Sequence, residues 1–212
     1  MRFPIFASFI VFGLWLMYEI SKSKKTNLKA MQDFWEKESE ANGVRKKPLD
    51  HLDYIAIPYD TLPFDLLRDD PIVTEAIQTI QDLKEKRIVN LTGITNTELK
   101  LTYGTANITV LTEYDQNYTL YASAICKWGE ALYNADFQKE AVALLELGIA
   151  SRTDISTNYR ILYHYYTQTG DDAKIKWLRD TAETLNSAMK NTIIRLLWGG
   201  GQTAESTDPY NG

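Results

Sequence analysis

The chain has 212 residues, a mass of 24.3 kDa, 44% hydrophobic residues and a net charge of −5. This composition is typical of one globular domain, with or without an appendage, and excludes a wholly disordered, collagenous or polytopic membrane protein. The acidic balance gives no electrostatic support to a nucleic-acid-binding surface. Because Cys126 is the sole cysteine, an internal disulfide and a thiolate zinc site are excluded. We therefore expect no cofactor, no metal and no nucleic-acid partner.

Residues 3–20 form the longest apolar stretch of the sequence, and its first charge is Glu19. A helix of this length spans roughly 27 Å, close to the ~30 Å thickness of a bilayer core. Trp15 and Tyr18 are suited to the headgroup interface at its end, and basic residues follow directly: Lys22, Lys24, Lys25 and Lys29. The pattern predicts a transmembrane anchor over residues 1–21, and hence a single-pass protein of the cell membrane.

A cleaved signal peptide is the alternative to a retained anchor, but its apolar core would be shorter and its start more basic than one arginine, Arg2. The positive-inside rule predicts that the lysines, and with them the body of the protein, lie in the cytoplasm. The alternative is that these lysines bind anionic headgroups, which leaves the orientation open.

Residues 22–68 are expected to contain a juxtamembrane helix followed by an extended strap. The helix carries an apolar stripe and ends at an Asn-Gly pair; the stripe consists of Leu28, Met31, Phe34 and Trp35. This stripe has three interpretations: it docks on the domain, contacts the membrane or pairs with a second copy. The strap contains Pro48, Pro58 and Pro63, which exclude helix through most of it, yet it is too apolar for a solvated linker. We expect it to lie across the helical body.

Residues 69–198 are predicted to form a helical domain. Asp70 and Pro71 are typical of a helix start, with an apolar face formed by Ile72, Ala76, Ile80 and Leu83. Two short helices are expected next, at residues 98–103 after a Thr97 cap and near residues 108–114. From residue 117 onward, helical stripes alternate with turns at residues 134–136, 153–154 and 169–171, which predicts antiparallel neighbours. Residues 199–212 are expected to be a disordered tail.

An internal repeat is visible when residues 128–148 are compared with residues 162–182, at a constant offset of 34 residues. The matched positions resemble the tetratricopeptide repeat, and the residues that fit its pattern are Gly129, Ala141, Tyr159, Leu162, Tyr166, Gly170 and Ala182. Tyr163 and Ile175 depart from the pattern, and no proline closes either repeat. The resemblance implies an all-α solenoid of antiparallel hairpins. As a whole, the chain is also similar to single-pass membrane-anchored bacterial proteins through FWEKESEAN, RKKPLD and TNTELKLTYG, a similarity that implies no activity.

In tetratricopeptide domains, the first helix of each repeat lines a groove that binds protein segments. Carried to this sequence, the resemblance assigns the groove to Ser123, Cys126, Glu130, Tyr133, Asn134, Thr157, Arg160, His164, Thr167 and Gln168. We therefore expect a membrane-anchored scaffold or adaptor that recruits a protein partner, in an oligomeric state that the sequence does not define. The alternative is a permanent structural subunit of a membrane assembly. An enzyme is the third hypothesis, with Glu130 and His164 as its candidate acid/base pair, but without a nucleophile motif we expect no catalysis.

Two further features of the sequence could carry chemistry. The strap carries Asp50, His51, Asp53 and Asp60, which could form a metal or acid/base site, although an acidic surface turn is the favoured interpretation. Cys126 could be a reactive thiol, but a free cysteine is more often a small buried hydrophobic residue.

Overall fold

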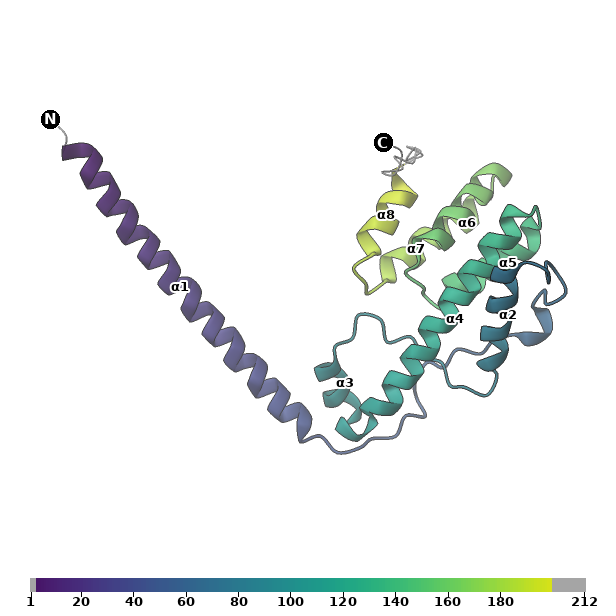
Figure 1. The fold of residues 1–212 in the computed structure, drawn as a ribbon, viewed down its shortest axis with the longest axis horizontal. Coiled ribbons are helices and arrows are strands. Elements are labelled where there is room, and N and C mark those ends of the chain that lie inside the picture. The colour runs from purple at the N-terminus through teal and green to yellow at the C-terminus, as the bar shows by residue number, and fades with distance from the viewer. Residues whose placement is uncertain (1–2, 200–212) are drawn as a thin grey trace. The chain divides into compact units, whose positions relative to one another are not determined.

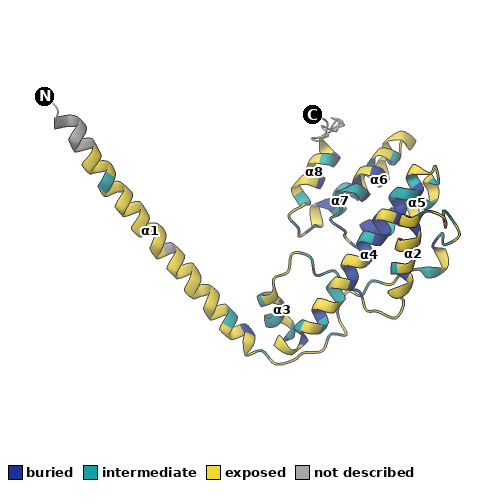
Figure 2. Cartoon of the chain, in the orientation of Figure 1, coloured by how far each residue is buried: buried dark blue, intermediate teal, exposed yellow. Residues whose placement is uncertain are grey.

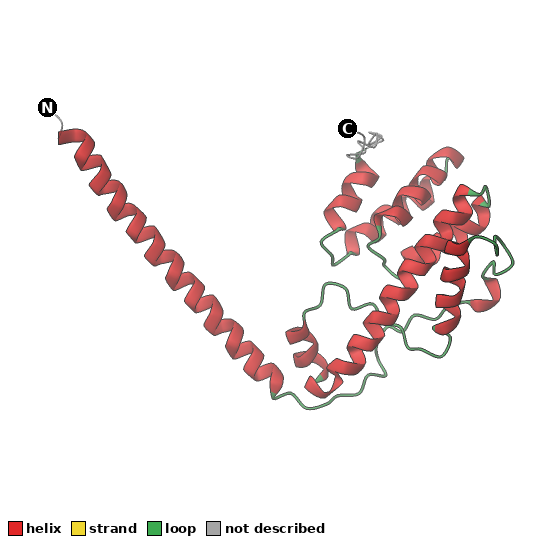
Figure 3. Ribbon diagram, in the orientation of Figure 1, coloured by secondary structure: helices red, strands yellow, loops and turns green. Residues whose placement is uncertain are grey.

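The structure is a computed structural model that describes residues 3–199, with side chains from Phe9 onward except that of Thr26. Within these residues every regular element is a helix, and the pairing of Tyr54 with Val89 is an isolated antiparallel bridge rather than a strand (Figure 3). The prediction of an all-α fold is confirmed. Residues 200–212 of the expected disordered tail lie outside the described part of the chain.

The chain divides into two compact units, each built from two segments (Figure 1). Unit 1 consists of Met1–Pro48 and Thr95–Ile108, and unit 2 consists of Leu49–Ile94 and Thr109–Gly212. The predicted strap is therefore shared between the units, because the boundary after Pro48 falls within it.

Unit 1 is dominated by α1, a single helix from Phe3 to Asn42. The predicted anchor and juxtamembrane helix are thus parts of one uninterrupted helix. Its apolar stripe is exposed, with 52–61% of the surface of Leu28, Met31, Phe34 and Trp35 accessible (Figure 2). Among the residues whose side chains are described, no helix combines the length and apolarity that a membrane crossing requires. The first six residues of the apolar stretch 3–20 lie outside that set.

The second helix of unit 1, α3, extends from Asn96 to Tyr103. Its cap is Thr95 and not the expected Thr97, because Thr95 forms a reciprocal capping box with Glu98. Thr97 instead donates a hydrogen bond of 2.8 Å to Oε2 of Glu38 in α1. The hydroxyl that the sequence offered as a cap therefore joins the two helices.

The end of α1 and the start of the strap are held to α3 and to the 3₁₀ turn η2, Thr105–Asn107. Lys100 forms an ion pair with Glu38, and Asn107 donates to the carbonyl oxygens of Lys47 and Tyr103 at 2.8 and 2.7 Å. Gly104, at φ +89°, permits this close approach, since a Cβ there would lie 2.2 Å from the carbonyl oxygen of Arg45. These contacts make the C-terminal end of α1 part of a packed unit.

Unit 2 contains the remaining helices, with α4 beginning at the unit boundary. Their bounds are α2 Pro71–Asp82, α4 Ile108–Asn134, α5 Gln138–Ala150, α6 Ser156–Thr169, α7 Asp172–Thr184 and α8 Lys190–Trp198. The turns between α4, α5, α6 and α7 occur where the sequence predicted them. The separate short helix near residues 108–114 was wrong, because α4 is continuous across it. No glycine or proline interrupts residues 105–128, so nothing in the backbone ends the helix there.

The start of α2 follows its predicted cap, since Asp70 Oδ1 accepts hydrogen bonds from the main-chain nitrogens of Ile72 and Val73 at 2.7 and 3.2 Å. The predicted buried face is wrong at one position. Ile72 is 51% exposed, and Val73 is buried with Ala76 and Ile80. The apolar stripe is therefore rotated by one residue at the first turn.

The strap packs against the body of unit 2 as predicted, with one 3₁₀ turn, η1, at Tyr59–Thr61. Tyr59 donates its hydroxyl proton to the carbonyl oxygen of Ile80 at 2.9 Å, and the Phe64 ring lies 5.5 Å from that of Trp128. Leu62 is 8% exposed. The strap is therefore an integral part of the hydrophobic core.

The core of unit 2 consists of two clusters. The first surrounds Trp128 and joins α2, α4 and α5 to the strap. The second surrounds Tyr159 and Leu162 and joins the helices α5, α6, α7 and α8. Buried positions accordingly concentrate on α4, α5 and α6 (Figure 2). Helices α4 and α5 approach closely at Gly129, where a Cβ would lie 2.7 Å from the side chain of Leu145.

Candidate functional site

Two cross-helix contacts place the predicted groove residues of α4 beside those of α6. Arg160 donates from Nη2 to Oε1 of Glu130 at 3.1 Å, and the Tyr133 hydroxyl lies 3.0 Å from Nδ1 of His164. These pairs lie one helical turn apart on both helices, so the two rows of side chains run alongside each other. The structure thus brings together residues that lie about thirty positions apart in sequence.

The exposure of the ten predicted residues is uneven. Asn134, Arg160, His164, Thr167 and Gln168 are exposed; Ser123, Glu130, Tyr133 and Thr157 are partly exposed; and Cys126 is buried. We call the nine accessible residues the α4–α6 surface.

Cys126 lies beneath the α4–α6 surface with 6% of its area exposed. Burial raises the pKa of its thiol to about 11, Glu130 adds to this increase, and Arg160 opposes it. The thiol is therefore protonated at neutral pH, whereas a nucleophilic cysteine needs its thiolate form. The position suits a small buried side chain.

His164 is held at both ring nitrogens. Nδ1 lies 3.0 Å from the Tyr133 hydroxyl, and Nε2 lies 3.4 Å from Nε2 of Gln168. Since the amide nitrogen of Gln168 can only donate, a neutral imidazole accepts at Nε2 and donates from Nδ1 to the Tyr133 oxygen. The histidine is thus a bridging residue between α4 and its own helix.

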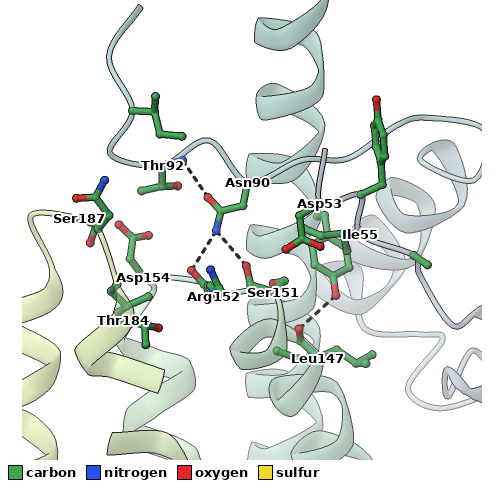
Figure 4. Close-up of a pocket in the computed structure, with 17 residues that line it drawn as sticks. Asp53, Ile55, Asn90, Thr92, Leu147, Ser151, Arg152, Asp154, Thr184 and Ser187 are labelled. Atoms are coloured by element: carbon green, nitrogen blue, oxygen red, sulfur yellow. Dashed lines mark hydrogen bonds between the residues drawn. The ribbon is translucent and has the colours of Figure 1, made fainter. Parts of the chain in front are cut away.

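The sequence reasoning missed a cavity of about 430 Å³ elsewhere in unit 2. Its wall is formed by the strap, residues 90–94, Tyr121 of α4, the α5–α6 turn and the α7–α8 turn (Figure 4). At its centre Asn90 donates from Nδ2 to the carbonyl oxygens of Ser151 and Arg152 at 3.0 and 3.2 Å. No periodicity could reveal this site, because most of its residues lie in turns.

A second cavity of about 320 Å³ lies between the strap, α5 and Trp177 of α7. Its one charged lining residue, Glu146, accepts hydrogen bonds from Tyr166 and from Lys174, the latter at 2.7 Å. Burial raises the pKa of Tyr166, and the hydrogen bond to Glu146 raises it further. The carboxylate of this cavity is therefore already engaged by neighbouring side chains.

The strap residues Asp50, His51, Asp53 and Asp60 do not form a metal site in the structure. Among the described residues, no group of three or more histidine, cysteine, aspartate or glutamate side chains could hold a metal ion. Asp53 instead lines the larger cavity.

Comparisons with protein-family models, with curated proteins and with solved structures found no match to this chain.

Proposed function

We propose that this protein is a membrane-anchored scaffold or adaptor that recruits a protein partner through the α4–α6 surface. The observation that carries the proposal is the pairing of Glu130 with Arg160 and of Tyr133 with His164 across two neighbouring helices. Together with the exposed side chains of Thr167 and Gln168, these pairs form an exposed polar strip that carries both charges and amides. Such a strip suits hydrogen bonding to an extended peptide segment.

The proposed architecture is a short tetratricopeptide-like array, with α4–α5 and α6–α7 as its repeats and α8 as its cap. Three features support it: short turns between the helices, the close approach of α4 and α5 at Gly129, and the left-handed Gly170 that ends α6. In such an array the first helices of successive repeats are neighbours, as α4 and α6 are here. Two repeats make a shallow groove, which fits a short segment of a partner.

The proposed membrane attachment rests on the apolar sequence of residues 3–20, which begins α1. From Phe9 to Ile20 every large apolar side chain of this helix is at least 43% exposed. An exposed apolar run of this extent requires a partner or a lipid phase to cover it. The lysines that follow favour a cytoplasmic body.

Site-specific photo-crosslinking in cells tests the proposed surface. A photoreactive amino acid is placed at Gln168, and a matched control carries it at Lys139, an exposed position on α5 outside the surface. The proposal expects a discrete protein adduct from Gln168 that is absent from Lys139 and is lost when Arg160 is changed to Glu. Equal adducts from both positions, or none from either, would overturn it.

A permanent subunit of a membrane assembly is the second candidate, favoured by the exposed apolar stripe of α1. A photoreactive residue at Trp35, 60% exposed, tests this stripe directly. A stoichiometric adduct from Trp35 that still forms when isolated membranes are irradiated at high salt supports the permanent subunit. A salt-sensitive adduct from Gln168 alone supports the recruiting adaptor, because polar contacts are screened by salt.

The orientation is tested by protease protection of cells stripped of their wall, with an epitope placed after Gly212. If the epitope survives until the membrane is broken, the body is cytoplasmic. If it is removed from intact cells, the lysines contact headgroups, and the partner must be sought outside the membrane.

A further inference from the structure

The larger cavity of unit 2 has the size and construction of a ligand site. Its volume of about 430 Å³ falls within the ~300–1,000 Å³ range of ligand pockets. Five segments that are distant in sequence converge on it, and it shares no residue with the α4–α6 surface. A ligand bound in this cavity is therefore separate from the proposed partner segment.

Several neutral donors in its wall are already committed to main-chain carbonyls. Asn90 Nδ2 donates to Ser151 and Arg152, Asn186 Nδ2 donates to Gly93 at 3.0 Å, and Ser151 Oγ donates to Gly148 at 2.8 Å. The wall consequently has few neutral donors left for a ligand that needs to accept hydrogen bonds.

The two carboxylates of the wall, by contrast, are not committed to other side chains within the described part of the chain. Asp53 and Asp154 line the cavity, and no hydrogen bond or ion pair engages either carboxylate among the residues whose side chains the structure describes. Figure 4 shows them on opposite sides of Asn90. Arg152 is the one lysine or arginine of the lining, so the wall carries two carboxylates against one guanidinium.

Apolar side chains complete the wall, including Ile55, Ile94 and Leu147. A ligand that satisfies both parts needs a cation on an aliphatic stem. We propose that this cavity binds an alkylammonium or alkylguanidinium group, which is the chemistry of a lysine or arginine side chain. The stem packs on the isoleucines and the leucine while the cation hydrogen-bonds to Asp154, and the charge of Asp53, on the other side of Asn90, adds a weaker attraction.

Isoleucine-methyl NMR of the full chain in a neutral detergent provides the test, because Ile55 and Ile94 lie in the wall while Ile193 is buried in the second core cluster. The probes are N-acetyl-lysinamide, its neutral analogue N-acetyl-norleucinamide, and the peptide acetyl-Ala-Lys-Leu-amide. We expect N-acetyl-lysinamide to shift the Ile55 and Ile94 methyls without moving that of Ile193, and norleucinamide to bind at least tenfold more weakly.

Variants of the charged residues sharpen the test. Asp154→Asn, at a half-buried position, should weaken lysinamide binding about tenfold, and Asp53→Asn, which is exposed, about threefold. Asp60→Asn, an exposed strap residue outside the cavity, should leave binding unchanged. Arg152→Asn should strengthen binding about threefold, because it removes the opposing charge; asparagine tolerates the φ of +59° at this position.

The peptide distinguishes the two sources of this chemistry. Binding of acetyl-Ala-Lys-Leu-amide tenfold tighter than N-acetyl-lysinamide assigns the cavity to a lysine within a polypeptide, and equal binding assigns it to a free amine. Equal binding of norleucinamide, or no methyl shift at about 10 mM lysinamide, where a millimolar site is largely filled, would overturn the proposal. Neither result affects the crosslinking test at Gln168, so the cavity proposal and the proposed partner surface can be refuted independently.

Discussion

The ring of Phe64 in the strap lies 5.5 Å from the ring of Trp128, a residue of α4 with no exposed surface. This contact makes the strap a structural part of unit 2. Phe64→Ala should lower the free energy of unfolding by about 2 kcal/mol, less than for a fully buried phenylalanine because Phe64 is partly exposed.

Denaturation of the full chain, followed by circular dichroism, measures this loss. Leu120→Ala is the matched control, since Leu120 is a large apolar residue of α4 that is 52% exposed. Its expected cost is about 0.5 kcal/mol or less. Equal costs for the two variants would contradict a strap that belongs to the core.

The close approach of α4 and α5 makes a second prediction. Gly129→Ala places a Cβ 2.7 Å from the Cγ and Cδ2 atoms of Leu145, so the leucine or the helices must shift. We expect a loss of about 1–3 kcal/mol in stability, the usual cost of overpacking a core. Thermal unfolding compares it with Gly170→Asn, which keeps the left-handed turn in open space and should be nearly neutral.

The helical pattern and turns of residues 134–198 could be predicted because each turn carries its own local signal, such as the left-handed Gly170. The strap could be recognised because prolines and apolar residues coincide there. Two features were predicted wrongly. Thr95 has the local advantage over Thr97, since Glu98 three residues later completes a capping box, and Glu38 of α1 engages Thr97. The exposure of Ile72 depends on how α2 is rotated against its neighbours.

The candidate sites divide in the same way. The approach of α4 to α6 was accessible through the repeat offset of 34 residues, which aligns Glu130 with His164. The contacts themselves differ by one turn, because Glu130 pairs with Arg160 and His164 with Tyr133. The cavity around Asn90 was not accessible in this way, since its wall joins five turns and segments whose proximity follows from the packed fold alone.

The ion pair of Glu38 with Lys100 predicts an acid-sensitive junction in unit 1. The hydrogen bond from Lys100, followed by that from Thr97, lowers the pKa of Glu38. A lowered folded-state pKa gives stability that is present above the unfolded-state pKa of about 4.3 and is lost as pH falls through the folded-state pKa. The junction should therefore loosen at pH values below about 4.3.

Hydrogen exchange of the α3 amides, corrected for intrinsic chemical exchange, measures this junction. Glu38→Gln should reduce protection at neutral pH, and the difference from the unmodified protein should shrink as the pH falls below the unfolded-state value. Glu36→Gln, at an exposed position of α1, should leave α3 unaffected. A difference that stays constant with pH would show that the ion pair does not hold α3.

The buried thiol of Cys126 makes a prediction about reactivity. A pKa raised to about 11 leaves a thiolate fraction at pH 8 that is roughly two hundred times smaller than that of an unperturbed cysteine. Iodoacetamide should therefore modify the folded protein very slowly and the unfolded protein at the ordinary rate, as followed by mass spectrometry. Modification of the folded protein at the ordinary rate would show that the thiol is accessible and ionised.

Variants of the ion pair between Glu130 and Arg160 distinguish a binding role of this pair from a structural one. Both side chains are substantially exposed, at 41% and 59%, so Arg160→Glu should change the free energy of unfolding by at most about 1 kcal/mol. The same change reverses a charge in the centre of the α4–α6 surface and should abolish the adduct formed from Gln168. The double variant Glu130→Arg with Arg160→Glu restores the ion pair with opposite polarity. If the pair serves only to hold α4 against α6, the double variant recovers the adduct; if the partner reads the charges individually, folding is normal and the adduct stays absent.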